Sequence, residues 1–526
     1  MNVLKTDVLV IGAGAAGIRA AVEAAVHGVD VTLVNNARVT ASGSTFSQVS
    51  RGWGIQALLD GERTAQGIDF FFNEIITVGQ GVCDPDLVRL LVEESGERVK
   101  ELVDYGVRFK KAEDGKFLRA KGCFSESERA VLTSDFDNLR CAFLSKLQQY
   151  RVRIVTGTVV DLIVQDGICY GGYLFDVQNI FFQIAAKATI LATGGGGAIY
   201  ENHLCGAEST GDGYALALRA GAQLFNMEFI QFMLGLKSGR QRQFLPRHLL
   251  HQDNILIDAA GKPVLESCIP DVVHKENAVR LREKHCPAST CDASFIIDQS
   301  IWEASRKTGS VFWNAEKNAS TMPKVVHMAH AFNGGIRIDA TSASTLKGLF
   351  AAGEVAAGPH GADRIGGCMM TATQVFGKRA GQYAAEYARD KMHLDTPTLL
   401  SSQIPVLKPG EESEQEREQL AWLKRTVTQA MDKYVNVVRS KHGLEACRRV
   451  LIDADRQLVS MEGARRENYL RYSKIRNMID VAGQIVKSAI RRKTSCGAHF
   501  RADTHLKQEI DDSARLSFTP RAKHAV

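Results

Sequence analysis

The sequence predicts an α/β fold in three parts, and three observations lead to that prediction. An apolar run rich in Val and Ile begins at Asp7 and leads directly into a Gly-x-Gly-x-x-Gly turn and an alanine-rich helix. Glycine-rich segments then occur in two blocks on either side of residues 233–326, where charge rises and glycine falls. Beyond residue 419, apolar residues recur at helical spacing. We therefore expect a Rossmann-like nucleotide-binding domain, an inserted capping domain and a C-terminal helical domain.

The N-terminal glycines are the strongest local signal. The apolar run before them is typical of a parallel strand buried on both faces. We expect Gly12 to make the tight turn, Gly14 to let the backbone approach a pyrophosphate, and Gly17 to let helix and strand pack closely. The helix that follows directs free N–H groups toward the phosphates. A glycine-rich turn alone is weak evidence, but a second strand at residues 31–34 completes the unit and favours dinucleotide binding.

The second strand ends in Asn35-Asn36, where an acid normally binds the ribose. An amide still forms hydrogen bonds but carries no charge. The absence of the acid argues against NAD as the cofactor, and less strongly against FAD. Polar, glycine-spaced segments follow at residues 42–47 and 51–55. They are suited to a loop that wraps a ligand.

Composition excludes several classes of protein. A chain of 526 residues is too long for one core, so two or three domains are expected. Hydrophobic residues make up 45% and charged residues 24%, and the net charge of +6 is too small to indicate a nucleic-acid partner. The eleven cysteines show no metal-like spacing, so we expect reduced thiols and no metal site. Because we see no membrane-spanning run and no signal peptide, a cytoplasmic location is expected, with any membrane association provided by a partner.

Three further segments have clear patterns. Residues 85–105 carry leucine and valine at helical spacing and predict a helix. Residues 152–164 are rich in β-branched side chains and predict strands, with a hairpin turn at Asp166-Gly167. Residues 188–193 read as another buried strand, which ends in four consecutive glycines.

These patterns divide the chain into five predicted parts. The expected boundaries are 1–232 and 327–394 for the two halves of the nucleotide-binding domain, 233–326 for the capping domain, 395–418 for a linker rich in proline and glutamate, and 419–526 for the helical domain.

Taken together, the sequence resembles the flavoprotein subunits of succinate dehydrogenase and fumarate reductase, a family that includes L-aspartate oxidase. The resemblance extends over nearly the whole chain and rests on seven blocks in the same order. Besides the N-terminal glycines, they are residues 192–195, 209–213, 227–232, 351–354, 360–367 and 476–478. The resemblance implies FAD as the cofactor.

In this family, a histidine often binds the flavin covalently. Here Ser44 stands at the matching position. A hydroxyl cannot replace the imidazole in that bond, so we expect non-covalent FAD. The cofactor contacts that we predict are Gly12, Gly14, Ala15, Gly17, Asn35, Ser44, Thr45, Gly54, Thr193, Gly194, Asp212, Glu354 and Gly367.

The family's reaction requires a cage of cations around a dicarboxylate. The resemblance implies that Arg364 binds a carboxylate and that His330 orients or protonates the substrate, so these two are the predicted catalytic residues. Met233 replaces a histidine of the family pattern, and Cys291 stands near the position of its proton-passing arginine. Arg280, Arg282 or the basic residues at 240–251 could compensate, although a solvated basic surface is the simpler interpretation. We therefore expect an organic acid other than plain fumarate, succinate or aspartate.

Two functions remain open at this point. The first is an FAD-dependent oxidoreductase that moves a hydride between the flavin and a carbon of an organic acid. The alternative is an electron-transfer flavoprotein subunit of a redox complex, without dicarboxylate turnover of its own. Since the chain has no cysteine cluster for an iron–sulfur centre, any such centre must belong to a partner subunit. We also expect the chain to be part of an oligomer.

Overall fold

The computed structural model describes residues 2–46, 52–239, 241–314, 322–391, 412–461 and 468–504. Its centre is a mixed sheet in which four neighbouring pairs are parallel, in the order β6-β2-β1-β8-β16, while β7 pairs antiparallel with both β6 and β8. The strands are β1 (Asn2–Ile11), β2 (Val31–Asn35), β6 (Arg153–Gln165), β7 (Ile168–Asp176), β8 (Phe181–Leu191) and β16 (Leu349–Ala351). The predicted α/β class and the hairpin at Asp166-Gly167 are thereby confirmed, and the strand predicted at residues 188–193 is the end of β8, which stops at Leu191.

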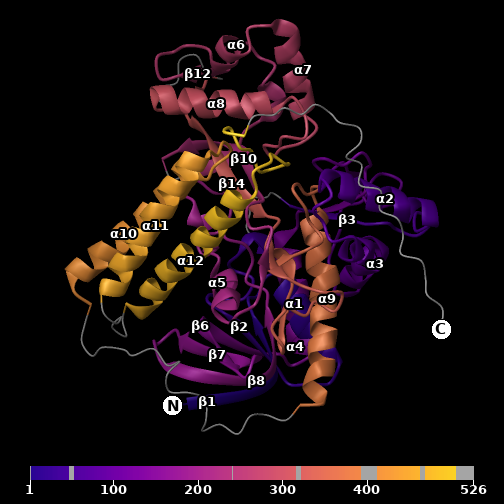
Figure 1. The fold of residues 1–526 in the computed structure, drawn as a ribbon. Helices are drawn as coiled ribbons and strands as arrows, with labels where there is room; N and C mark the ends of the chain where they lie inside the picture. Colours follow the sequence, from indigo (N-terminus) through magenta and orange to yellow (C-terminus); the bar gives the residue numbers. More distant parts are fainter. Residues whose placement is uncertain are drawn as a thin grey trace, which may run out of the picture.

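The first strand is buried as its composition predicts. Val8, Leu9 and Val10 are fully inaccessible to solvent, because β1 lies between β2 and β8 and helices cover the sheet. Burial of each such side chain contributes about 1.5–3 kcal/mol. The α1 helix (Ala15–Val26) packs on α9 (Cys368–Arg389), with α4 (Phe136–Gln149) beside it (Figure 1). The glycine turn is thus held between a buried strand and a buried helix.

Smaller elements complete this part of the molecule. The predicted helix at residues 85–105 is α3 (Pro85–Asp104), which lies beside α2 (Ala65–Val78) and α9. The remaining elements are β3 (Trp53–Gln56), β4 (Arg119–Ala120), β5 (Ala130–Thr133), α5 (Asp212–Arg219), β9 (Leu224–Phe225), β15 (Gly335–Arg337) and β17 (Ala356–Ala357).

The cap is a separate layer at the end of the molecule opposite the N-terminus (Figure 1). Its sheet has the order β11-β10-β14-β13-β12, and its apolar residues form a cluster of their own. The elements are β10 (Ile230–Ser238), β11 (Gln241–Phe244), β12 (Leu256–Asp258), α6 (Val264–Cys268), α7 (Val272–Arg282), α8 (Phe295–Thr308), β13 (Val311–Trp313) and β14 (Lys324–Phe332).

Two strands connect the cap to the rest of the chain. The boundaries expected at 232/233 and 326/327 fall inside β10 and β14, and these strands pair with each other, with Met233 opposite Met328. The backbone therefore enters and leaves the cap along one antiparallel ribbon.

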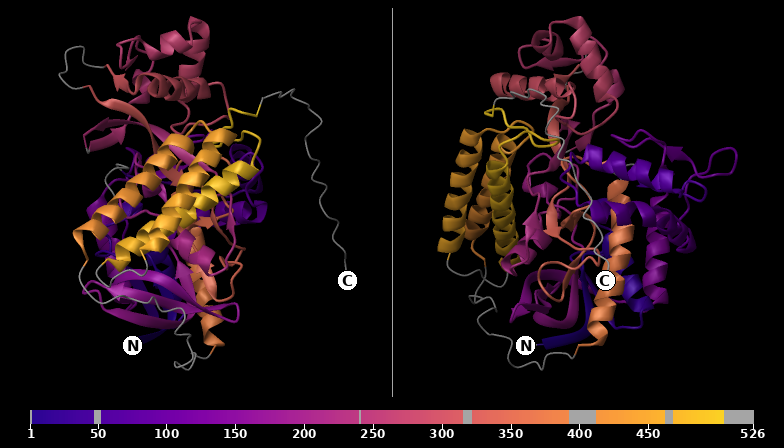
Figure 2. Two further views of the ribbon diagram at one scale, coloured as in Figure 1. Left: turned by 60° about the vertical axis from the view of Figure 1, so that its left-hand side comes forward. Right: turned by 45° about the vertical axis from the view of Figure 1, so that its right-hand side comes forward.

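The described part of the C-terminal domain contains three helices, α10 (Glu414–Tyr434), α11 (Lys441–Ser460) and α12 (Tyr469–Arg491), on the side of the molecule away from α9 (Figures 1 and 2). The prediction that the linker reaches residue 418 is wrong. Ser413 and Glu416 form a capping box that begins α10 at Glu414, so the late glutamates form a first helical turn. Residues 395–411 of the predicted linker and residues 505–526 of the predicted helical domain lie outside the described residues. Within the described residues, no helix combines the length and the apolar composition that crossing a membrane requires.

Candidate flavin and substrate site

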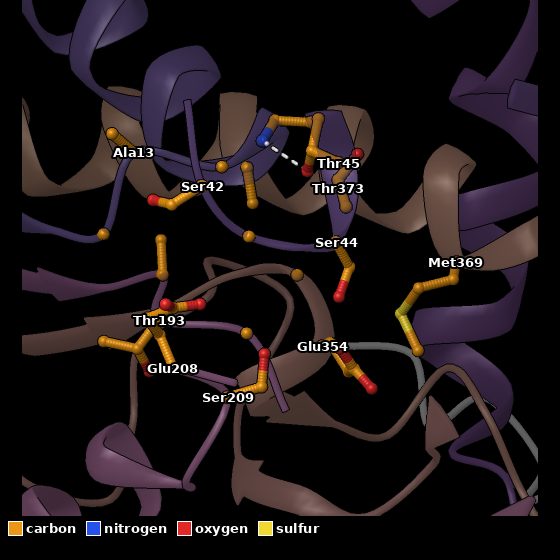
Figure 3. Close-up of a pocket in the computed structure, with 18 of the residues that line it drawn as sticks. Ala13, Ser42, Ser44, Thr45, Thr193, Glu208, Ser209, Glu354, Met369 and Thr373 are labelled. Atoms are coloured by element: carbon orange, nitrogen blue, oxygen red, sulfur yellow. Dashed lines mark hydrogen bonds between the residues drawn. The ribbon is translucent and has the colours of Figure 1, made fainter. Parts of the chain in front are cut away.

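A cavity of about 360 Å³ lies at the carboxyl ends of β1 and β8 (Figure 3). Of the thirteen predicted cofactor residues, twelve line it: Gly12, Gly14, Ala15, Asn35, Ser44, Thr45, Gly54, Thr193, Gly194, Asp212, Glu354 and Gly367. Gly17 does not. A Cβ there would collide with the carbonyl oxygen of Gly12, so this glycine allows the helix to pack on the turn.

The first turn combines a tight backbone with an open side. Gly12 has a φ of +105°, and a side chain there would collide with the carbonyl group of Ala192. At Gly14, by contrast, the nearest atom to an added Cβ is the Thr45 Oγ1, at 3.3 Å. The Ala15 N–H donates to the same Oγ1 at 3.1 Å, which attaches the 44–46 turn to the start of α1 (Figure 3). Gly14 therefore borders open space in which a phosphate can approach the helix N-terminus.

Asn35 holds the end of β2 against this turn. Its Oδ1 accepts a hydrogen bond from the Ala13 N–H at 3.2 Å, and its Nδ2 donates to the Ala37 carbonyl at 2.8 Å. The amide thus uses both polar atoms on the backbone, which explains why an uncharged residue suits this position.

Glu354 organises the opposite wall. Its buried carboxylate accepts hydrogen bonds from the N–H groups of Gly195, at 3.1 Å, and Phe332, at 3.0 Å, while burial raises its pKa. The carboxylate thereby holds the glycine turn after β8. In that turn Gly194 has a φ of +76° and no heavy atom within 4 Å of an added Cβ, and the buried Thr193 hydroxyl has no hydrogen-bond partner among the described residues.

Asp212 connects the cavity to the C-terminal helices. It begins α5, and its Oδ1 accepts a hydrogen bond from Asn477 Nδ2 on α12 at 2.7 Å. Arg219 in turn donates to Asn477 Oδ1 at 2.8 Å and pairs with Asp480. The 476–478 block of the sequence therefore supports the wall of the cavity from another domain.

The start of α9 forms a third wall. Gly367 is its N-cap with a φ of +94°, and a Cβ there would lie 2.8 Å from the carbonyl oxygen of Gly54. Met369, Met370 and Thr373 also line the cavity but were not predicted from the sequence. The two glycines that precede this helix were a signal that its first turns lie at the site.

These features fit FAD. The open sides at Gly14 and Gly194 leave room for a pyrophosphate, the N-termini of α1 and α9 supply backbone N–H donors, and the Thr193 hydroxyl lacks a partner among the described residues. Ser44 points into the cavity (Figure 3).

Both predicted catalytic residues line the same cavity. Arg364 is buried, and its Nη1 donates to the Ile365 carbonyl at 3.0 Å, while Nε has no partner within the described residues. Burial, together with the nearby Arg364 guanidinium, lowers the pKa of His330 to about 3, so this imidazole is neutral at physiological pH. Its ring contacts that of Phe244 edge-on at 6.0 Å. A fixed cation and a neutral imidazole thus face one cavity.

The other candidates for a cationic cage lie elsewhere. Cys291 does not line the cavity, and its side chain is exposed. Arg282 pairs with the buried Asp298, and Arg242 donates to backbone carbonyls. Arg280 donates to Asn277, and His251 pairs with Glu283. Arg240 and the Arg247 side chain lie outside the described part. Among the described residues that line the cavity, Arg364 is the only arginine or lysine.

Comparison with known proteins agrees with this geometry. Residues 7–370 match the family described as FAD binding domain, and residues 424–521 match the one described as fumarate reductase flavoprotein C-term. One subunit of the fumarate reductase (CoM/CoB) of Methanothermobacter marburgensis is 31% identical, over 94% of each chain. L-aspartate oxidase of Streptomyces coelicolor is 28% identical, over 95% of this chain and 89% of its own. The solved structure of Mycobacterium smegmatis Sdh1 aligns with a TM-score of 0.78 and 26% identity, over 96% of this chain and 90% of its own.

The fold, the cavity and the first of these matches define an FAD-binding flavoprotein. The chain belongs to the family of FAD-dependent oxidoreductases that contains the fumarate reductase and succinate dehydrogenase flavoproteins and L-aspartate oxidase.

Proposed function

We propose that this protein uses non-covalently bound FAD to oxidise or reduce an organic acid that has one carboxylate and an uncharged far end. The observation that carries the proposal is the charge of the cavity, in which Arg364 is the only arginine or lysine among the described lining residues. One guanidinium can bind one carboxylate through two parallel hydrogen bonds. A second carboxylate of the substrate would have no such cationic partner in the cavity. It would therefore lack charge-assisted hydrogen bonds that contribute about 1.5–3 kcal/mol each.

Each residue has a definite role in this proposal. Arg364 binds the carboxylate, and its Nε–H, which has no partner among the described residues, provides an unused donor. The neutral His330 donates or accepts a hydrogen bond at the substrate and thereby orients it. FAD, when bound, supplies the chemistry of hydride exchange.

The test is a screen of organic acids against the purified holoprotein. The flavin is reduced with dithionite under anaerobic conditions, and its absorbance is followed after addition of 2-enoic acids with one carboxylate or of fumarate. Saturated acids and L-aspartate are tested against the oxidised flavin. We expect changes with monocarboxylates. Turnover with fumarate, succinate or aspartate at about 1 s⁻¹ or faster, an ordinary enzymatic rate, would contradict the proposed specificity.

The alternative of an electron-transfer component has its own support, since the Methanothermobacter relative is named as one subunit of its enzyme. This alternative predicts that no acid changes the flavin absorbance of the isolated chain. An electron-transfer partner, for example one with an iron–sulfur centre, should change that absorbance. The same screen therefore separates the two functions.

Replacing Arg364 by lysine should reduce kcat/KM for the best acid by about 10- to 100-fold. Lysine keeps the charge but cannot reproduce the planar pair of donors, and the loss corresponds to about 1.5–3 kcal/mol. Steady-state kinetics and flavin content are measured together. Arg242→Lys is the matched control, because Arg242 donates to the backbone carbonyls of His203 and Glu201 and does not line the cavity. Equal values for Arg364→Lys and the wild type would exclude Arg364 as the carboxylate ligand.

Non-covalent binding makes a simple prediction. After denaturation in trichloroacetic acid and centrifugation, all the yellow colour should be in the supernatant, because the Ser44 hydroxyl forms no bond with the flavin. The absorbance of supernatant and pellet at 450 nm checks this. Colour in the washed pellet would show a covalent link through another residue.

A further inference from the structure

We propose that a second cavity, in the cap, binds the uncharged far end of the acid and selects a group the size of a phenyl ring. This inference rests on the proposed function. The cavity has a volume of about 140 Å³. Its apolar lining consists of Met233, Leu234, Phe244, Leu245 and Leu250.

The two cavities share one side chain. Phe244, at the end of β11, lines both of them. On the side of the larger cavity, its ring lies 6.0 Å from that of His330, which faces the same space as Arg364. Among the described residues, Phe244 is thus the one side chain common to both linings, and its partly exposed ring forms part of the wall between the two spaces.

Met233 makes part of the lining of the second cavity apolar. Met233 stands where the family pattern has a histidine, and in the structure its side chain forms part of the cavity lining. A thioether offers polarisable apolar surface and no strong donor. Where the family pattern has a histidine donor, this chain therefore has an apolar surface that favours an uncharged group.

The polar residues around this cavity carry no uncompensated charge. Arg282 donates to Asp298 at 3.1 Å and to the carbonyls of His285 and Pro287. The His285 Nδ1 is itself 2.8 Å from the Pro287 carbonyl. Because Asp298 balances the guanidinium, a second carboxylate would lose its hydration without gaining a free cation.

The volume sets the size of the ligand group. An engineered cavity of roughly 150 Å³ lined by leucine, isoleucine and phenylalanine stays dry and binds benzene. The cap cavity is similar in size, and five of its eight lining residues are apolar, so its volume accommodates a phenyl or a branched group of similar size. Full burial of such a group strengthens binding by about 10- to 100-fold.

The experiment compares trans-cinnamate, which carries a phenyl group, with crotonate, which carries a methyl group at the same position. Their dissociation constants are measured on the oxidised holoprotein from the perturbation of flavin absorbance. Cinnamate should bind about 10- to 100-fold more tightly than crotonate. Leu250→Phe fills the cavity and should remove most of this difference, with crotonate binding unchanged. Leu249→Phe is the control, since the neighbouring Leu249 is half-buried and lines neither cavity.

Leu245→Phe narrows the same cavity from another position and replaces Leu250→Phe if that variant does not fold, as judged by flavin content and thermal midpoint. Equal affinity of wild type for the two acids, or the same loss in the Leu249→Phe control, would overturn the inference. These results are independent of turnover. The proposed function fails instead if no acid changes the redox state of the flavin, whatever the binding constants are.

Discussion

A Gly14→Val protein should fold but contain no flavin, which would remove all activity. In the structure, an added Cβ at Gly14 comes within 4 Å of one atom, the Thr45 Oγ1 at 3.3 Å, and a shift of a few tenths of an ångström in that hydroxyl makes room for it. That room is the space into which Gly14 lets the pyrophosphate approach the start of α1. The substitution therefore affects the ligand far more than the fold.

The measurement is the ratio of absorbance at 450 nm to that at 280 nm after purification and reconstitution with excess FAD, with circular dichroism as the check on folding. Gly483→Val is the control, because Gly483 lies on α12, far from the turn in the sequence, and also has open space at its Cβ position. A Gly14→Val protein with one flavin per chain would show that the pyrophosphate does not approach this turn.

The second large effect concerns the stability of the cap. Asp298→Ala should destabilise the folded state by about 3–5 kcal/mol, because it leaves Arg282 buried without its counter-charge. Asp298 is fully buried, 3.1 Å from Arg282 Nη2 and 3.1 Å from His327 Nε2. Urea unfolding measures the loss. Asp253→Ala removes an exposed ion pair with Lys275 in the same cap and should cost about 1 kcal/mol or less. Equal effects of the two substitutions would contradict the assigned role of Asp298.

The same pair predicts the response to acid. Burial raises the pKa of Asp298, but Arg282 and His327 outweigh this effect, and the pKa lies below its ordinary value. A depressed carboxyl pKa contributes stability that is present above the unfolded pKa and is lost as pH falls through the folded pKa. The difference in stability between wild type and Asp298→Ala should therefore shrink below about pH 4, near the pKa of an unfolded aspartate. Urea unfolding at pH 7 and at pH 3 tests this, and an unchanged difference would contradict it.

The sequence predicted those parts of the site whose chemistry is local. The Gly12 turn and the neutral end of β2 at Asn35 each depend on a short pattern that limits the backbone, whereas Gly367 was predicted as a cofactor contact and not as the start of α9. The linker prediction failed at residues 414–418 because glutamates in a first helical turn have the same composition as a solvated linker. A capping box at Ser413 and Glu416 was the distinguishing signal.

Features formed by distant segments were not predictable. Phe244 reaches both cavities only because β11 lies on the edge of the cap sheet, and no pattern around residue 244 indicates that arrangement. The family pattern likewise suggested Cys291 near the position of the proton-passing arginine, whereas in the structure it lies in a cap loop and does not line the larger cavity. The support of Asp212 by Asn477 joins residues 265 apart, and it depends on the packing of α12 against α5.

The ribbon of β10 and β14 also has an evolutionary consequence. Paired strands lie about 5 Å apart, so the whole segment beyond the ribbon begins and ends at almost the same place. A different module with two adjacent chain ends could be joined there without changing the glycine turns of the flavin-binding domain. This geometry makes the cap a unit that recombination could exchange at two neighbouring points of the chain, while the flavin-binding domain is inherited intact.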